Sequence, residues 1–170
     1  VINIGMVPTP LVYFAANNSE YSSGISVTGS HNPPDYNGLK IVIDGHALSG
    51  DAITGLFDRI VEKRIIQTTV HGVVSHRDIV PDYTRYIADD IQIDRPLKVV
   101  IDCGNGVPGA VAPEVLRSIG ADVEEIYCDV DGNFPNHHPD PSDPDNLIDL
   151  IESVRRTGAA WGASVAQSPP

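Results

Sequence analysis

The second half of the chain alternates strand-like apolar runs with helix-like segments, and this alternation restricts the fold more than any other feature. The run "LKVVIDC" (97–103) is almost continuously apolar, which is typical of a strand buried on both faces. A helix pattern follows it, then the strand-like run "VEEIYC" (123–128) and a second helix pattern that ends before Gly158. Such an order favours a parallel or mixed sheet covered by helices. We therefore predict an α/β protein with mixed sheets and helices packed on them.

The first half of the chain predicts two helices and, between them, a pair of strands. Thr9-Pro10 is typical of a helix start, with Thr9 as the N-cap. Residues 49–66 have one apolar stripe at helical spacing, made of Ile53, Leu56, Phe57, Ile60 and Val61. The periodicity weakens between residues 65 and 77, and a further helix begins at Pro81. We expect a domain boundary here, which divides the chain into residues 1–76 and 77–170.

The two predicted strands are "GISVT" (24–28) and "LKIVIDG" (39–45). The second strand alternates the apolar residues Leu39, Ile41 and Ile43 with Lys40. Because successive side chains of a strand point to opposite faces, Lys40 is expected to point away from the apolar face.

The charge balance is acidic, with 23 Asp and Glu against 11 Lys and Arg and a formal net charge of −12. This disfavours nucleic acid or an anionic membrane surface as a partner, since both attract clustered cations. A phosphorylated small molecule still fits, because a few cations and backbone N–H groups bind it. Cys103 and Cys128 are too few for a disulfide scaffold and lack metal-binding spacing. We expect two buried, reduced thiols in a cytoplasmic protein, and no apolar run is long enough to span a membrane.

A single serine, Ser30, lies between the two predicted strands in "TGSHNPPDYNGLKI" (28–41). Two prolines stiffen this loop and Asn37-Gly38, a hairpin-turn signal, closes it. A serine held in this way, with His31 beside it and Lys40 on the returning strand, is a candidate covalent site. The alternative is structural, because Ser, Asn, Asp and Gly also gather in turns for conformational reasons alone.

Two hydrolase arrangements do not fit the spacing around Ser30. The nucleophile elbow requires glycines two residues before and two residues after the serine, where this chain has Thr28 and Asn32. A triad of Ser30, His31 and Asp35 would require adjacent side chains to face each other, which extended backbone disfavours.

A glycine-rich segment, "IDCGNGVPG" (101–109), supports a different function. Gly104, Gly106 and Gly109 form G-x-G-x-x-G after a strand and before a helix, with Asp129 about 20 residues further on. This pattern is typical of an NAD-binding Rossmann domain of an oxidoreductase. Pro108 lies inside the fingerprint and removes an N–H near the helix start, so we favour a structural turn over a nucleotide site.

The segment "CDVDGNFPNHHPDPSDPD" (128–145) gathers histidines and carboxylates: His137, His138, Asp140, Asp143 and Asp145. Such residues are metal ligands in many proteins. Adjacent histidines cannot easily converge on one ion, and Asp143 before Pro144 is better suited to cap a helix. We interpret the segment as a structured loop, with metal binding as the alternative.

The motif "TGSHNPPDYNGLKI" closely resembles the active-site serine loop of the α-D-phosphohexomutases, in particular the bacterial phosphomannomutase/phosphoglucomutase branch. The resemblance runs from "GMVPTP" (5–10) through "DGNFPNHHPDPSDPDNL" (131–147). It implies three-layer α/β/α domains: the rear part of domain I in 1–76 and an incomplete domain II in 77–170. It also implies that Ser30 carries the transferable phosphate, that Lys40 is the general acid/base, and that His31 positions the loop or shares in proton transfer.

The resemblance further implies the reaction and its partners. The expected activity is reversible transfer of phosphate between C1 and C6 of mannose or glucose phosphates, through a bisphosphorylated sugar and a phosphoserine. The partners are then hexose 1- and 6-phosphates, and the parent enzyme is expected to be a monomer.

The family also implies Mg²⁺, held by the phosphate on Ser30 and by three aspartates of an Asp-Gly-Asp-Gly-Asp loop after the strand that follows Gly158. Here the chain reads "AAWGASVAQSPP" (159–170) and has no aspartate after Asp149. We therefore expect a partial mutase with an intact serine loop and no turnover by itself. A non-catalytic remnant or binding module is the remaining alternative.

Overall fold

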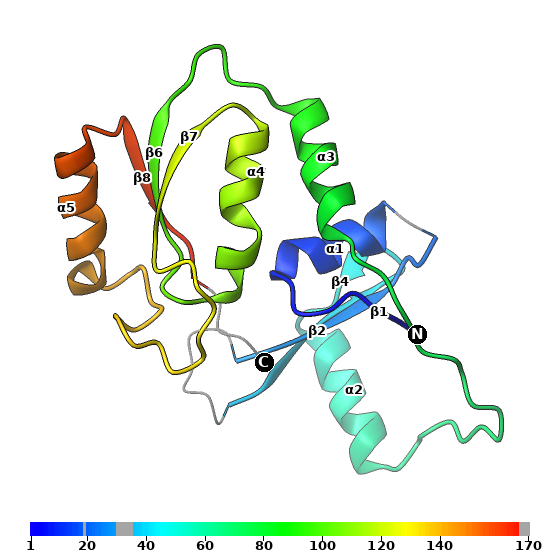
Figure 1. The fold of residues 1–170 in the computed structure, drawn as a ribbon. Helices are drawn as coiled ribbons and strands as arrows, with labels where there is room; N and C mark the ends of the chain where they lie inside the picture. The colour runs from blue at the N-terminus through cyan, green and yellow to red at the C-terminus, as the bar shows by residue number, and fades with distance from the viewer. Residues whose placement is uncertain (19, 30–35, 167–170) are drawn as a thin grey trace.

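The structure is a computed structural model that describes residues 1–18, 20–29 and 36–166 (Figure 1). Within these ranges the strands form three small sheets. The smallest sheet joins two distant segments, since β1 (Ile2–Asn3) pairs in parallel with β5 (Ser75–His76). The α/β class is confirmed, with parallel and antiparallel pairing in separate sheets: of the other two sheets, one is antiparallel and one is parallel.

The antiparallel sheet contains the predicted strand pair. Its strands are β2 (Gly24–Thr28), β3 (Gly38–Ile43) and the short β4 (His46–Ala47), in that spatial order. Helix α1 (Thr9–Asn17) lies against one face of it. The approach is close, because a Cβ atom added to Gly24 would lie 2.9 Å from Val12 Cγ1. A glycine on β2 therefore allows the helix to pack directly on the strand.

The alternation in β3 is confirmed, but the two faces have unexpected environments. The polar face is the covered one: Ser26 and Thr28 on β2 are buried, and Lys40 on β3 is partly buried. The opposite face is apolar and open, with Leu39 61% and Ile43 48% exposed. The position of α1 explains this arrangement, because α1 covers the Lys40 face and no element of the described residues covers the other.

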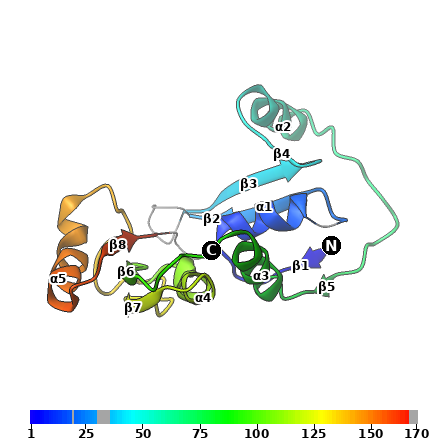
Figure 2. The same cartoon turned by 90° about the horizontal axis from the view of Figure 1, so that it is seen from above.

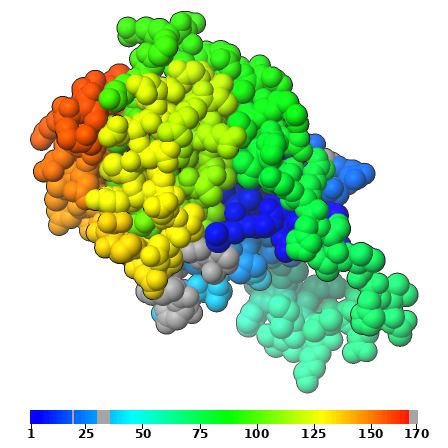
Figure 3. Space-filling model, in the orientation of Figure 1, coloured from blue at the N-terminus to red at the C-terminus, as the bar shows by residue number. Residues whose placement is uncertain are grey.

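The predicted helix at residues 49–66 is present as the shorter α2 (Asp51–Val61). Its apolar stripe is present too, yet none of the residues of α2 is buried, and Phe57 is 63% exposed. In Figures 1 and 2, α2 and the segment after it extend away from the rest of the fold, and Figure 3 shows the same part projecting from the surface.

The parallel sheet has the order β7–β6–β8, formed by β6 (Lys98–Asp102), β7 (Asp122–Ile126) and β8 (Trp161–Ser164). After β6 come the 3₁₀ turn η1 (Val107–Ala110) and α4 (Ala112–Ser118). After β7 come η2 (Pro144–Leu147) and α5 (Ile148–Thr157). Helices α4 and α5 lie on opposite sides of the sheet in both Figures 1 and 2, which makes this part a three-layer α/β/α unit.

Helix α3 (Val80–Asp90) connects the two parts of the molecule and contacts both α1 and α4. A shared core lies between these helices, formed by the buried residues Leu11, Ala15, Ile79 and Val111. Phe14 of α1 packs against Tyr83 of α3 with ring centroids 5.4 Å apart in an edge-to-face arrangement. The antiparallel sheet and the parallel sheet are thus held together through α3.

The predicted cap of α1 is wrong by one position. Thr9 is the first helical residue, the N-cap is Pro8, and no side chain caps this end. The hydroxyl of Thr9 instead accepts a hydrogen bond from Lys40. The predicted capping role of Asp143 is confirmed, since its Oδ1 accepts a hydrogen bond from the amide of Asp145. The element that it caps is η2, the 3₁₀ turn that leads into α5.

None of the helices in the described ranges has both the length and the apolarity that crossing a bilayer requires.

Candidate active site

The hairpin of β2 and β3 fixes both ends of the segment that contains the candidate serine. Thr28, the last residue of β2, is the register partner of Gly38, the first residue of β3. A Cβ atom at Gly38 would lie 3.0 Å from the carbonyl oxygen of Thr28, so a glycine here allows the two strands to approach closely. Asn37-Gly38 is therefore not the centre of a two-residue turn. Residues 29–37 connect the strands, and Gly38 already belongs to β3.

Ser30 and His31 lie outside the described residues, and so does Asp35 of the excluded triad. Among the three candidate catalytic residues, the structure therefore places Lys40.

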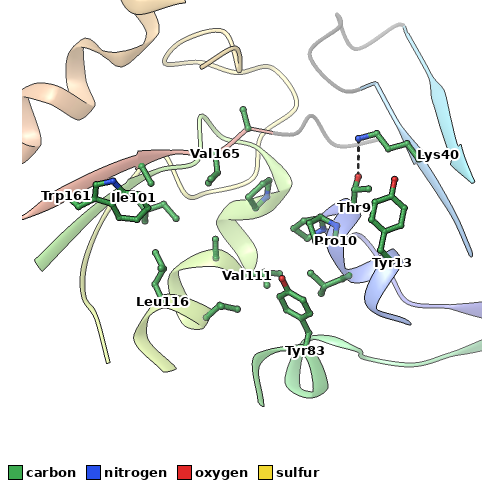
Figure 4. Close-up of a pocket in the computed structure, with 17 residues that line it drawn as sticks. Thr9, Pro10, Tyr13, Lys40, Tyr83, Ile101, Val111, Leu116, Trp161 and Val165 are labelled. Carbon is green, nitrogen blue, oxygen red and sulfur yellow. Dashed lines mark hydrogen bonds between the residues drawn. The ribbon is translucent and has the colours of Figure 1, made fainter. Parts of the chain in front are cut away.

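Lys40 lies on β3 opposite Ser26 of β2, on the polar face that α1 covers. Its Nζ donates a hydrogen bond to Thr9 Oγ1 at the start of α1 over 3.5 Å (Figure 4). This contact draws the amine toward α1 and the second part of the molecule rather than into open solvent. Lys40 is partly buried, so its charge is not fully surrounded by water.

A cavity of about 680 Å³ lies beside Lys40, between α1 and the parallel sheet (Figure 4). Its walls are mostly apolar and come from both parts of the chain, for example Tyr13 of α1, Val111 beside α4 and Trp161 of β8. Among the described residues that line it, Lys40 is the one charged side chain. Lys40 is therefore the lining side chain that can stabilise a negative charge, while most of the other walls are apolar.

Val165 and Ala166, which follow β8, line the same cavity as Lys40. The family resemblance places its metal-binding aspartates in this stretch. Here both side chains are apolar, and within the described part of the chain no three His, Cys, Asp or Glu side chains gather closely enough to hold a metal ion. The residues that the structure describes therefore do not fit a magnesium site.

The glycine-rich segment 104–109 is a tight turn packed against its neighbours. Gly104 has a φ of +49°, and a Cβ atom there would lie 3.1 Å from the ring of His137. A Cβ atom at Gly109 would lie 2.0 Å from the carbonyl oxygen of Cys128. The space that a pyrophosphate would need beside these glycines is occupied by the loop after β7, which favours the structural interpretation over the dinucleotide site.

A buried contact that the sequence patterns did not predict joins Asp102 and His137. Asp102 ends β6 with no exposed surface, and His137 Nε2 lies 3.1 and 3.2 Å from its two carboxylate oxygens. His137 Nδ1 lies 2.9 Å from the carbonyl oxygen of His138, so both ring nitrogens have a polar partner. Burial raises the pKa of Asp102 above its usual range.

Other polar residues in and beside this loop have structural contacts. Asp140 Oδ1 accepts hydrogen bonds from the amide and hydroxyl of Ser142, and Asp143 caps η2. Asn105, with a φ of +58°, donates its side-chain amide to the carbonyl of Asp129. These contacts agree with the interpretation as a structured loop. The signal for the missed pair was the acid at the end of a buried strand, because a buried carboxyl requires a partner.

Two family models match the chain: phosphoglucomutase/phosphomannomutase alpha/beta/alpha domain I over residues 1–65, and alpha/beta/alpha domain II of the same family over residues 81–166. Both matches are to mutase domains, and neither supports an oxidoreductase.

Relatives with the same family name cover nearly all of the chain. A phosphomannomutase/phosphoglucomutase of Pseudomonas aeruginosa is 52% identical over 162 residues, and a phosphoglucomutase of Neisseria meningitidis is 47% identical over the same length. Each alignment includes 95% of this chain but 35% of the relative, so the chain spans about a third of the relatives' length. A crystal structure of a phosphoglucomutase/phosphomannomutase family protein from Burkholderia thailandensis superposes with a TM-score of 0.88 at 46% identity, over 95% of this chain and 37% of that one.

Proposed function

The chain belongs to the phosphoglucomutase/phosphomannomutase family, and from this we propose that it carries the phosphoserine loop of a hexose-phosphate mutase. The whole enzyme would move phosphate reversibly between C1 and C6 of mannose or glucose phosphates through a bisphosphorylated sugar. The residues proposed to act are Ser30 as phosphate carrier, Lys40 as general acid/base, and His31 as a group that positions the loop or shares in proton transfer.

The observation that best supports this proposal is the position of Lys40. Its Nζ contacts the start of α1, at the rim of a cavity to which both parts of the chain contribute. Lys40 pairs with Ser26, and two residues along the same strands Gly38 pairs with Thr28. This second pair holds the two ends of the serine segment. A cation fixed beside the base of this loop suits phosphoryl transfer, in which placement and charge stabilisation matter most.

The chemistry assigned to these residues is a two-way exchange. In the forward direction the bond between phosphorus and Ser30 Oγ breaks and Lys40 gives a proton to Ser30 Oγ, while a new bond forms from phosphorus to a sugar hydroxyl oxygen, whose proton passes to water. When the other phosphate of the bisphosphorylated sugar returns to Ser30, Lys40 takes the proton back from Ser30 Oγ, and the sugar oxygen that is released takes a proton from water.

Further properties are proposed for the whole enzyme. We propose magnesium as its metal, a cytoplasmic location and a monomeric state. For this chain alone we propose no turnover and no magnesium site of its own, since the stretch after β8 that is described offers apolar side chains. We keep the domain boundary between residues 76 and 77, which the interval between the two matched family models supports.

The test is a chimeric enzyme in which residues 1–160 replace the matching segment of the Pseudomonas aeruginosa relative. We expect it to convert glucose 1-phosphate to glucose 6-phosphate. Ser30→Ala should lower kcat/KM by roughly four orders of magnitude or more, because the phosphate carrier is lost. Lys40→Met should lower it about 10²- to 10⁴-fold, the usual contribution of general acid–base catalysis.

Two exposed residues provide matched controls for these variants. Ser49→Ala and Lys63→Met change the same residue types in the same part of the chain at exposed positions, and both should leave kcat/KM within a factor of about two. Full activity of the Ser30→Ala chimera would overturn the proposal. Turnover of hexose phosphate by the 170-residue chain alone would overturn the expected inactivity.

A further inference from the structure

The two cysteines of the chain meet at the C-terminal ends of β6 and β7. The strands are in register up to Asp102 and Ile126, and the amide of Cys103 still donates to the carbonyl of Ile126. Tyr127, the residue that follows β7, has a φ of +53°. This left-handed backbone turns the chain and brings Cys128 beside Cys103, with the two Sγ atoms 3.4 Å apart.

The two thiols have different surroundings. Cys103 has no exposed surface, whereas Cys128 is partly exposed. The hydrogen bond with Cys128, followed by burial, raises the pKa of Cys103 well above its usual range. A soluble oxidant therefore reaches Cys128 first, and Cys103 is placed to react second.

We propose that Cys103 and Cys128 form a redox-active dithiol, which a small peroxide such as hydrogen peroxide converts to an intrachain disulfide. The Cys128 thiolate attacks one peroxide oxygen, the O–O bond breaks, hydroxide leaves, and Cys128 becomes a sulfenic acid. Cys103 then attacks the sulfenic sulfur, the S–S bond forms and the S–O bond breaks. The proton of Cys103 and the hydroxyl group leave as water. The two sulfurs lose two electrons, which reduce the peroxide to water.

The backbone around the site favours bond formation over separation of the sulfurs. Since a disulfide bond is about 2 Å long, the Sγ atoms must approach by roughly 1.4 Å, which a side-chain rotation can supply. The backbone of Cys128 cannot easily move away, because its carbonyl packs directly on Gly109 and the amide of Asn105 donates to the neighbouring carbonyl of Tyr127.

The test uses the purified, reduced chain. It is treated with hydrogen peroxide, quenched with N-ethylmaleimide, digested with trypsin and analysed by mass spectrometry without reduction. Cleavage after Lys98 and Arg117 places the two cysteines in different peptides, so the proposed bond appears as a linked pair. We expect linkage in the folded chain at least about tenfold faster than in guanidinium chloride, because folding holds the sulfurs together.

Single variants separate the two roles. In Cys103→Ser, peroxide should leave Cys128 as a sulfenic acid that dimedone traps. In Cys128→Ser, Cys103 should react at least about tenfold more slowly, because it is buried. The proposal would be overturned if both wild-type peptides carried N-ethylmaleimide after oxidation, if linkage occurred between chains instead of within one, or if the two variants reacted equally fast. None of these measurements depends on mutase activity.

Discussion

Asp102 and His137 illustrate how one buried contact can determine the stability of a loop. The carboxyl of Asp102 receives hydrogen bonds from the Gly104 amide and the His137 ring, and His137 also packs edge-on against Tyr127. His137→Ala leaves a buried carboxyl that has lost one partner. We expect the free energy of unfolding to fall by about 3 kcal/mol, measured by urea denaturation.

The neighbouring histidine provides the control for this prediction. The side chain of His138 is exposed, so His138→Ala should change the free energy of unfolding by about 0.5 kcal/mol or less. Equal losses for the two variants would mean that the contact with Asp102 does not stabilise the fold.

The hydroxyl of Tyr127 is expected to lose its proton at an unusually high pH. Its hydroxyl donates to Asp149 Oδ2 over 2.7 Å, and this hydrogen bond, followed by burial, raises the pKa of Tyr127 to about 12. The pKa is higher in the folded state than the ordinary value of 10.0. The contribution of this hydrogen bond to the free energy of unfolding is therefore complete below pH 10 and is lost as the pH rises from 10 to 12.

Tyrosinate absorbance measures this shift directly. The difference between the wild type and Tyr127→Phe should isolate one group with a pKa near 12. Asp149→Asn should return that pKa toward 10.0, since it removes the carboxylate that accepts the hydrogen bond of Tyr127 and also its negative charge. An unchanged titration curve in Asp149→Asn would contradict the assignment.

At the level of elements, the turn after β6 depends on the absence of a side chain at Gly109. Gly109→Ala would place a Cβ atom 2.0 Å from the carbonyl oxygen of Cys128, so the loop after β7 would have to move. We expect the free energy of unfolding to fall by roughly 3 kcal/mol. Circular dichroism during thermal unfolding measures the effect.

A glycine with open surroundings provides the matched comparison. Gly55 lies inside α2, and a Cβ atom there meets no atom within 4 Å. Gly55→Ala should therefore raise the stability of the helix by about 0.5–1 kcal/mol, because alanine favours helical backbone. A stabilising Gly109→Ala would show that the packing at Cys128 is not restrictive.

The sequence predicted the elements wherever their signals are local. The apolar run of β6 and the glycine at position 158, with a φ of +66° after α5, both have the predicted roles. The burial of the hairpin faces was not predictable in the same way. Alternation distinguishes two faces of β3, but the position of α1 decides which face is covered, and that is a tertiary contact. The predicted N-cap role of Thr9 was wrong for a related reason. Its hydroxyl accepts a hydrogen bond from Lys40 on a distant strand, which is also a tertiary contact.

The candidate site was predictable to a similar extent. The hairpin that flanks the motif is present, whereas the roles of Ser30 and Lys40, which come from the same motif, stay predictions. The pair of Asp102 and His137 is separated by 35 residues, and no periodic pattern links positions at that distance. Its only signal was a carboxyl at the end of a buried strand.

At the scale of the whole molecule, two apolar surfaces stand open in the described structure. One is the uncovered face of β2 and β3, where Ile25 is 62% exposed, and the other is the stripe of α2 with Phe57 and Ile60. Large contiguous apolar patches favour association. We expect the chain to self-associate in solution, measured by light scattering coupled to size-exclusion chromatography.

Variants of α2 test this prediction. A double variant, Phe57→Ser and Ile60→Ser, should shift the distribution toward the monomer and reduce binding of a hydrophobic dye. Asp58→Ser on the polar side of the same helix should leave association unchanged or increase it, since a negative charge is lost. A strictly monomeric wild-type chain would contradict the prediction.

The pairing of Thr28 with Gly38 has a consequence for how the serine segment could be varied. Both ends of residues 29–37 leave the sheet at one point, and the ladder of β2 and β3 holds that point together. Because the pairing of β2 and β3 already brings the two ends of the segment together, the sequence of the segment is not needed to offset the entropy lost on closing it. We therefore expect that the equivalent stretch of a relative can be inserted between Thr28 and Gly38 without altering the pairing of β2 and β3.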